Sequence, residues 1–217
     1  AKSGERARIA LAHLAERVAG AELTLARGEM GEDWCEGLDL SITITGPTAL
    51  TGTARDTKEV VRAMRDQDVI VFAGGDGTAR DIASVAGGTG ILGIPCGVKM
   101  HSGVFGVNPR AAGAMMADLI TNPKRIGFVE DAEVMDIDED ALRNGVLAPR
   151  LYGLARVPIS RSLMQAAKGG PRLNSSGALS SAAAEIVEEM DVETLYVIGP
   201  GTSAQSVAKA AGQTAST

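Results

Sequence analysis

The sequence lacks most features of secreted, membrane-bound or metal-stabilised proteins. It has only two cysteines, Cys35 and Cys96, in no Cys-x-x-Cys or Cys/His pattern, so neither a disulfide framework nor a structural zinc site is predicted. No apolar run approaches the ~18 residues of a membrane span, and the first ten residues, AKSGERARIA, lack the apolar segment of a signal peptide. We therefore expect a cytoplasmic protein without membrane contact. Because the first residue is not methionine, the sequence is compatible with a piece of a longer chain.

Positive charge and aromatic side chains are also scarce. The formal net charge is −6, which argues against a nucleic-acid partner because such proteins usually carry a basic face. Aromatic residues make up 3% of the chain, whereas 27 of its 217 residues are glycine, more than the usual ~7%. A hydrophobic share of 45% is typical of a folded globular protein. We expect a small anionic ligand that the backbone approaches closely.

Helical and strand patterns alternate along most of the chain. Continuously apolar strands between amphipathic helices are typical of a parallel sheet covered on both faces, with ligands bound at the carboxyl ends of the strands. From residue 130 onward, short strand-like segments and turns replace the long helical periods. The predicted helices cover 4–19, 54–65 and a segment starting at Asn108-Pro109, and the predicted strands cover 23–26, 41–45, 68–75, 91–95 and 195–199.

These patterns predict an α/β fold with a second, β-rich domain. We expect an α/β nucleotide-binding domain over residues 1–129, part of the β-rich domain over 130–178, and an α/β segment over 179–217 that returns to the first domain. The helix near residue 54 has a strong start signal, because Thr53 and Asp56 have the spacing of a capping box.

The most informative motif is the turn Gly74-Gly75-Asp76-Gly77-Thr78, which joins an apolar strand to a helix. Three glycines allow left-handed backbone conformations and a close approach of N–H groups to a phosphate, which the helix N-terminus also favours. Asp76 then becomes a candidate base that takes the proton of a hydroxyl attacking a phosphoryl group. The alternative is that Asp76 only caps the helix.

Two further segments follow strands in the same way. The loop after the strand at 91–95, GVKMHSGVF, contains three candidate ligands of a phosphoryl group, Lys99, His101 and Ser102, unless it is simply a solvated loop. A third glycine turn contains Gly199, Gly201 and Thr202 and opens another predicted helix. It is either a second phosphate site or an ordinary capped connection.

The strings VFAGGDGTARDI, LGIPCGVKMHSGVF and NPRAAG, in this order, resemble the ATP-NAD kinase-like family, which includes acetoin-catabolism protein X. The segments EVMDIDEDALRNG and LYVIGPGTS extend the resemblance over most of the chain. The GGDGT motif is shared across the wider NAD kinase and diacylglycerol kinase-like superfamily. GVKMHSGVF is the sharper signature.

The resemblance implies a kinase that transfers a phosphoryl group from ATP or inorganic polyphosphate to the 2′-hydroxyl of NAD, which yields NADP. Asp76 matches the proposed base, and Gly74, Gly75, Gly77 and Thr78 match the phosphate-binding turn. We expect Mg²⁺ on the substrate phosphates rather than in a protein cage, small nucleotides as partners, and a homo-oligomer. Two alternatives stay open: a kinase of another hydroxyl metabolite or lipid, and a nucleotide-binding regulatory protein without turnover.

Overall fold

The computed structural model describes residues 3–97, 100–137, 149–159, 183–184, 186–187, 190–191, 194–198 and 202–213. Contacts within the chain divide it into two compact units, Ala1–Lys168 and Gly169–Thr217. Among the described residues, no helix has the length and hydropathy of a transmembrane span.

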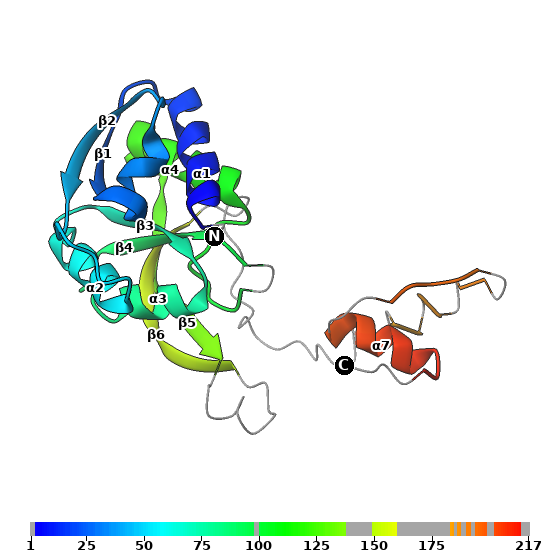
Figure 1. Ribbon diagram of the computed structural model, residues 1–217. Coiled ribbons are helices and arrows are strands. Elements are labelled where there is room, and N and C mark those ends of the chain that lie inside the picture. Colours follow the sequence, from blue (N-terminus) through cyan, green and yellow to red (C-terminus); the bar gives the residue numbers. More distant parts are fainter. Residues whose placement is uncertain are drawn as a thin grey trace. The chain divides into compact units, whose positions relative to one another are not determined.

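The first unit is a mixed α/β structure, as predicted (Figure 1). The expected order of helices and strands is confirmed up to the helix that starts at Asn108-Pro109, and two short 3₁₀ helices add to it at Gly28–Met30 and Glu32–Cys35. Its larger elements are α1 (Ser3–Arg17), β1 (Ala21–Ala26), β2 (Leu40–Thr45), α2 (Ala54–Ala63), β3 (Val69–Gly74), α3 (Asp76–Ala83), β4 (Gly90–Pro95), α4 (Pro109–Thr121), β5 (Gly127–Ile137) and β6 (Pro149–Ile159).

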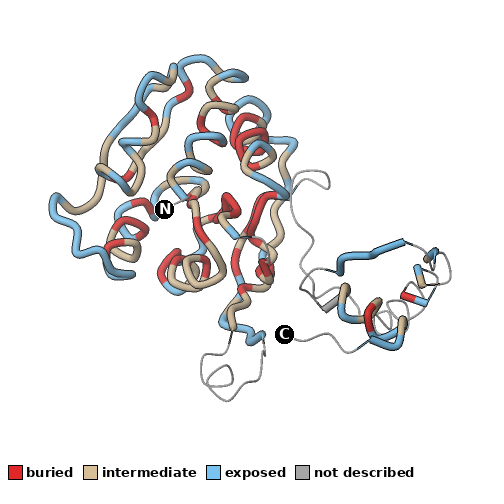
Figure 2. The backbone as a smooth tube through the Cα atoms, turned by 45° about the vertical axis from the view of Figure 1, so that its right-hand side comes forward, coloured by how far each residue is buried: buried red, intermediate tan, exposed pale blue. Residues whose placement is uncertain are grey.

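The parallel pair β3–β4 lies in the middle of this unit and is covered on both faces. Successive side chains of a strand point to opposite faces. Ile70 and Phe72 accordingly join one apolar cluster with residues of α2 and α3, whereas Leu92 joins another with residues of α1 and α4. In Figure 2, buried positions gather in the interior of this unit. This layering explains why both strands are nearly continuously apolar in sequence.

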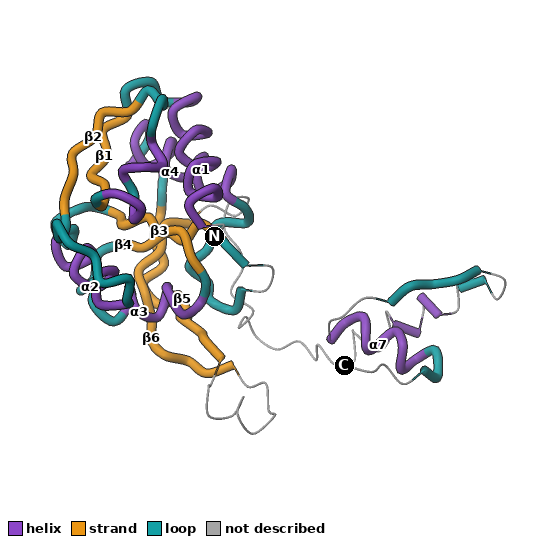
Figure 3. The backbone as a smooth tube through the Cα atoms, in the orientation of Figure 1, coloured by secondary structure: helices purple, strands orange, loops and turns teal. Residues whose placement is uncertain are grey.

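The predicted single parallel sheet is not confirmed. The strands form three separate pairs, of which β1–β2 and β3–β4 are parallel and β5–β6 is antiparallel. Figure 3 shows these strands in orange. The apolar residues Leu23 and Leu25 of β1 nevertheless pack against the same cluster as Leu92. Side-chain packing therefore joins the two parallel pairs, although no backbone hydrogen bonds connect them as one sheet among the described residues.

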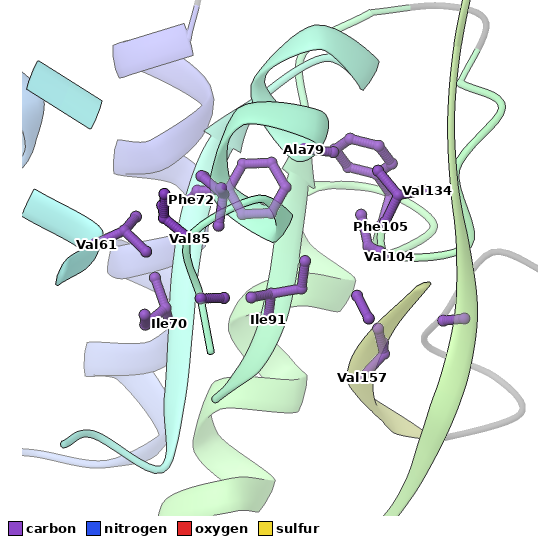
Figure 4. Packing of buried hydrophobic residues seen from close by; sticks show 14 of the residues in the cluster. Val61, Ile70, Phe72, Ala79, Val85, Ile91, Val104, Phe105, Val134 and Val157 are labelled. Atoms are coloured by element: carbon purple, nitrogen blue, oxygen red, sulfur yellow. The ribbon is translucent and has the colours of Figure 1, made fainter. Parts of the chain in front are cut away.

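The described part of the predicted β-rich domain is the hairpin-like pair β5–β6, and its inward residues belong to the main core. Val134 and Val157 are at most 2% exposed and lie in the cluster that also contains Ile70 and Ile91. In Figure 4, Ile91 lies between Ile70 and Val157. A separate β-rich domain is thus not confirmed, and the boundaries near residues 129 and 178 stay predictions.

The second unit contains helix α7 (Thr202–Ala210), which follows the predicted glycine turn. The prediction of a buried strand at 195–199 is wrong for its described residues: 195–198 form no strand, and Leu195 and Val197 are about 90% exposed. A strand needs a partner for its N–H and C=O groups, and the described residues of this unit contain no other extended segment paired with it.

Candidate functional site

The carboxyl ends of β3 and β4 meet at one edge, where the amide of Cys96 donates a 3.0 Å hydrogen bond to the carbonyl of Gly74. The chain continues from β3 directly into α3 and from β4 into the loop 96–106. Burial raises the pKa of the Cys96 thiol, an effect that the charge of Arg6 only partly opposes. The thiol therefore stays protonated at neutral pH and adds no charge to this edge.

The three glycines of the turn have different roles, and none has the left-handed conformation that we predicted. A Cβ atom at Gly74 would lie 2.6 Å from the Thr78 side chain, so Gly74 allows Thr78 to pack against the end of β3. Gly75 has an ordinary φ of −115°, and a Cβ atom there would meet none of the described residues within 4 Å. Backbone conformation therefore does not require glycine here. The space over Gly75 is open to a ligand.

Asp76 is the first residue of α3 and does not cap it. The N-cap is Gly75, and among the residues that the structure describes no side chain bonds the first amides of the helix. The Asp76 carboxylate turns instead to the loop after β4: Oδ1 accepts from the amide of Ser102 at 3.0 Å, and Oδ2 accepts from the amide of His101 at 2.8 Å. The Nδ1 atom of His101 lies 3.1 Å from the same Oδ2. Both oxygens therefore hold the loop, and only 9% of the Asp76 side chain is exposed.

Ser102 anchors this loop to β5. Its hydroxyl donates to the carbonyl of Met135 at 2.8 Å and accepts from the amide of the same residue at 3.0 Å. Ser102 is 2% exposed, and the following amide of Gly103 donates to the carbonyl of Glu133. The hydroxyl proton that we expected to reach a phosphoryl group is thus donated to a backbone carbonyl, because the loop is bound to the core rather than solvated.

The remaining predicted ligands divide into described and undescribed residues. Thr78 lies in the first turn of α3, and its side chain covers Gly74. Lys99, Gly199 and Gly201 lie outside the described residues, and of Thr202 only its place at the start of α7 is described. The structure therefore brings Gly74, Gly75, Gly77 and Thr78 together with Asp76, His101 and Ser102.

Two residues near this turn, Asp136 and Tyr152, were not predicted from the sequence. The Asp136 carboxylate forms an ion pair with Arg80, with 2.9 Å between Oδ2 and Nη1. A Cβ atom at Gly77 would lie 3.6 Å from the same Oδ2. The Arg80 guanidinium also lies 5.2 Å from the centre of the Tyr152 ring, within reach of a cation–π contact. The segment EVMDIDE was visible in the sequence, but its distance along the chain gave no sign that it returns to this turn.

A groove of about 300 Å³ lies beside α3, and its lining includes Lys58, Arg80 and Tyr152. Asp76 and His101 do not line it. Its two cations are already paired, Lys58 with Asp81 at 3.2 Å and Arg80 with Asp136. We therefore place the candidate site at the start of α3 and not in this groove.

The arrangement at the start of α3 combines two chemical functions. The first amides of a helix have no partners within it and attract anions, and here the residue before them has open space above its backbone. Beside them lies a carboxylate in contact with an imidazole, a pairing that can accept and hold a proton. Anion binding next to a basic group is what phosphoryl transfer to a hydroxyl requires.

Comparison with known proteins supports this interpretation. A family model described as the ATP-NAD kinase N-terminal domain matches residues 4–124, more than half of the chain. The match includes α3 and the loop that holds His101 and Ser102, and it ends before β5. No match is found among curated proteins or among solved structures.

Proposed function

Because the chain belongs to the ATP-NAD kinase family, we propose that it transfers a phosphoryl group from ATP or inorganic polyphosphate to the 2′-hydroxyl of NAD. The observation that carries the proposal is that the matched residues contain an uncapped helix start with a carboxylate–imidazole pair beside it. The match to the family supports kinase activity in general. The identities of the phosphoryl donor and of the acceptor hydroxyl are what we propose beyond the family match.

In this proposal the phosphate chain lies over Gly75 and against the first amides of α3. Phosphoryl transfer depends mainly on positioning and on stabilising charge, and these amides are fixed in place by the helix. The contact between Gly74 and Thr78 keeps the helix start close to the end of β3. The Asp76–His101 pair takes the proton of the attacking hydroxyl.

Mg²⁺ belongs with the substrate in this proposal. Within the described ranges, no three His, Cys, Asp or Glu side chains come together as a metal cage. The oxygens of Asp76 both accept hydrogen bonds from the loop. We therefore assign the ion mainly to the donor phosphates and water, because Mg²⁺ keeps several of its waters and binds substrate phosphates rather than a dedicated protein cage.

The direct experiment is to measure NADP formation by the purified chain with NAD, Mg²⁺ and either ATP or polyphosphate. Formation of NADP supports the proposal, and the preferred donor is read from the initial rates. A thermal-shift assay with each nucleotide measures binding separately, since a ligand at ~100 times its Kd adds ~2.7 kcal/mol of stability. Nucleotide binding with no NADP formation contradicts the proposed reaction and favours a regulatory protein without turnover.

A further inference from the structure

A second carboxylate, that of Asp136, lies beside the first turn of α3. Its Oδ2 would be 3.6 Å from a Cβ atom at Gly77, and its Oδ1 accepts from the amide of Ile137 at 2.8 Å, which fixes the direction of the carboxylate. The first hydrogen bond within the helix runs from the amide of Ala79 to the carbonyl of Gly75. The amide of Gly77 therefore belongs to the helix end that attracts anions. A negative charge next to it repels a phosphate chain unless a cation neutralises that charge.

Arg80 supplies the neutralising charge from the same helix. Arg80 and Gly77 are three residues apart in α3 and so lie on the same side of it. The Nη1 atom of Arg80 lies 2.9 Å from Oδ2 of Asp136, and the Tyr152 ring lies against the other part of the guanidinium. Only 32% of the Arg80 side chain and 18% of the Asp136 side chain are exposed. Because the pair is partly buried, water and salt screen its charges less than they screen those of surface residues.

We propose that the Arg80–Asp136 pair sets the affinity of the α3 start for a phosphate chain, with Arg80 cancelling the charge of Asp136. The inference rests on the proposed function, because it takes the donor phosphates to lie against the first amides of α3. With the pair intact, these two side chains add no net charge, and the amides attract the phosphates. Without the guanidinium, Asp136 repels them, and the repulsion grows with the number of charges on the ligand.

The decisive variant is Arg80→Met, which removes the charge but keeps an apolar side chain that can contact the Tyr152 ring. We expect the Kd for tripolyphosphate to rise about tenfold or more. The matched control is Lys58→Met. Lys58 pairs with Asp81 of α3 at 3.2 Å, and the two side chains are exposed almost equally to the first pair, 32% and 20%. That pair joins α3 to α2 instead of β5, and its loss should change the Kd by less than about threefold. Calorimetric titration measures both.

Two further variants separate charge cancellation from a direct bond between Arg80 and the phosphate. Asp136→Asn leaves the charge of Arg80 uncompensated, so the Kd for tripolyphosphate should fall below that of the wild type. The double variant Arg80→Met/Asp136→Asn again has no net charge at the pair, and its Kd should return to within about threefold of the wild type. A double variant that binds as weakly as Arg80→Met would overturn the inference, because Arg80 would then act through its own bonds or through folding.

The charge of the ligand and the activity of the wild type complete the test. The loss of affinity in Arg80→Met should be larger for tripolyphosphate than for inorganic phosphate, because the repulsion scales with ligand charge. An equal loss for both ligands, or no binding of tripolyphosphate by the wild type, would also overturn the inference. A wild type that forms no NADP, but whose variants bind tripolyphosphate as expected, contradicts only the proposed reaction. An active wild type with unchanged binding in Arg80→Met contradicts only the inference.

Discussion

Helices α2 and α3 both begin with an aspartate in the first turn, yet the two carboxylates do opposite things. Asp56 turns back onto its own helix start: its oxygens accept from the amides of Thr51, Gly52 and Thr53 and from the Thr51 hydroxyl. Asp76 turns away from its helix and holds a loop that lies 25 residues further along the chain.

The difference separates a structural helix start from a functional one. The start of α2 is closed, because Thr53 and Asp56 form a complete capping box. The start of α3 has glycine at the N-cap, no side-chain cap and open space over Gly75. Amides left without side-chain partners are costly to a helix unless a ligand or water satisfies them. We interpret the N-terminus of α3 as a helix end whose first amides are available to bind an anion.

The largest expected effect comes from replacing one aspartate at a time. Asp76→Asn should lower the rate of NADP formation ~10²–10⁴-fold, because the pair with His101 loses the carboxylate that serves as base. Asp56→Asn should leave the rate within about threefold and lower the melting temperature instead. Steady-state kinetics and thermal unfolding of both variants test the contrast. Equal loss of rate in the two would show that both aspartates act only through folding.

The glycines at the two helix starts should also respond differently to alanine. Gly75→Ala adds a methyl group where there is open space and no left-handed φ, so the only expected cost is that of alanine as a poorer N-cap, ~0.5–1 kcal/mol. The methyl group would obstruct a phosphate, and nucleotide affinity should fall by about tenfold or more. Gly52→Ala, at φ +73°, should cost ~1–2 kcal/mol and leave affinity unchanged. Calorimetric titration and urea unfolding measure the two effects, and unchanged affinity in Gly75→Ala would place the phosphate elsewhere.

The cap of α2 should contribute to stability alone. Thr53 accepts from the amide of Arg55 at 3.3 Å, and Thr53→Ala should lower the free energy of unfolding by ~1 kcal/mol. Urea unfolding followed by circular dichroism measures this loss. The rate of NADP formation in the folded variant should equal that of the wild type, and a large drop in rate would connect α2 to the site.

The smallest expected effect is a pH dependence of stability. Burial tends to raise the pKa of Asp56, but hydrogen bonds from Thr51, Gly52 and Thr53 outweigh it and hold the pKa below the ordinary 3.8. A carboxyl with a lowered pKa stabilises the fold above its ordinary pKa, and this contribution is lost as pH falls below 3.8 toward the folded-state value. Melting temperatures between pH 5 and pH 2.5 should fall less steeply in Asp56→Asn than in the wild type. Parallel curves would exclude Asp56 as a source of the acid sensitivity.

Tertiary packing overturned several local expectations. The loop after β4 has glycines and polar residues typical of solvated segments, but Met100, Val104 and Phe105 are buried in the main core. Phe105 contacts Phe72 edge to face, with ring centres 5.6 Å apart. A few apolar residues within a polar, glycine-containing loop form no periodic pattern, so the sequence alone does not indicate their burial. The same packing gives the Ser102 hydroxyl its partners in β5.

Local chemistry explains the features that were readable from the chain alone. Two helix caps are of this kind: the capping box of α2, and the Asn108 cap of α4, whose side chain accepts from the amide of Ala111. Each cap depends on groups at most three residues apart, so the local sequence determines it. The strand–glycine–helix junction at Gly74–Thr78 is of this kind too. The direction of the Asp76 carboxylate and the contact of Arg80 with Asp136 were decided only by the tertiary structure. Both join segments at least 25 residues apart, and such contacts form only where the core brings two chain segments to the same edge.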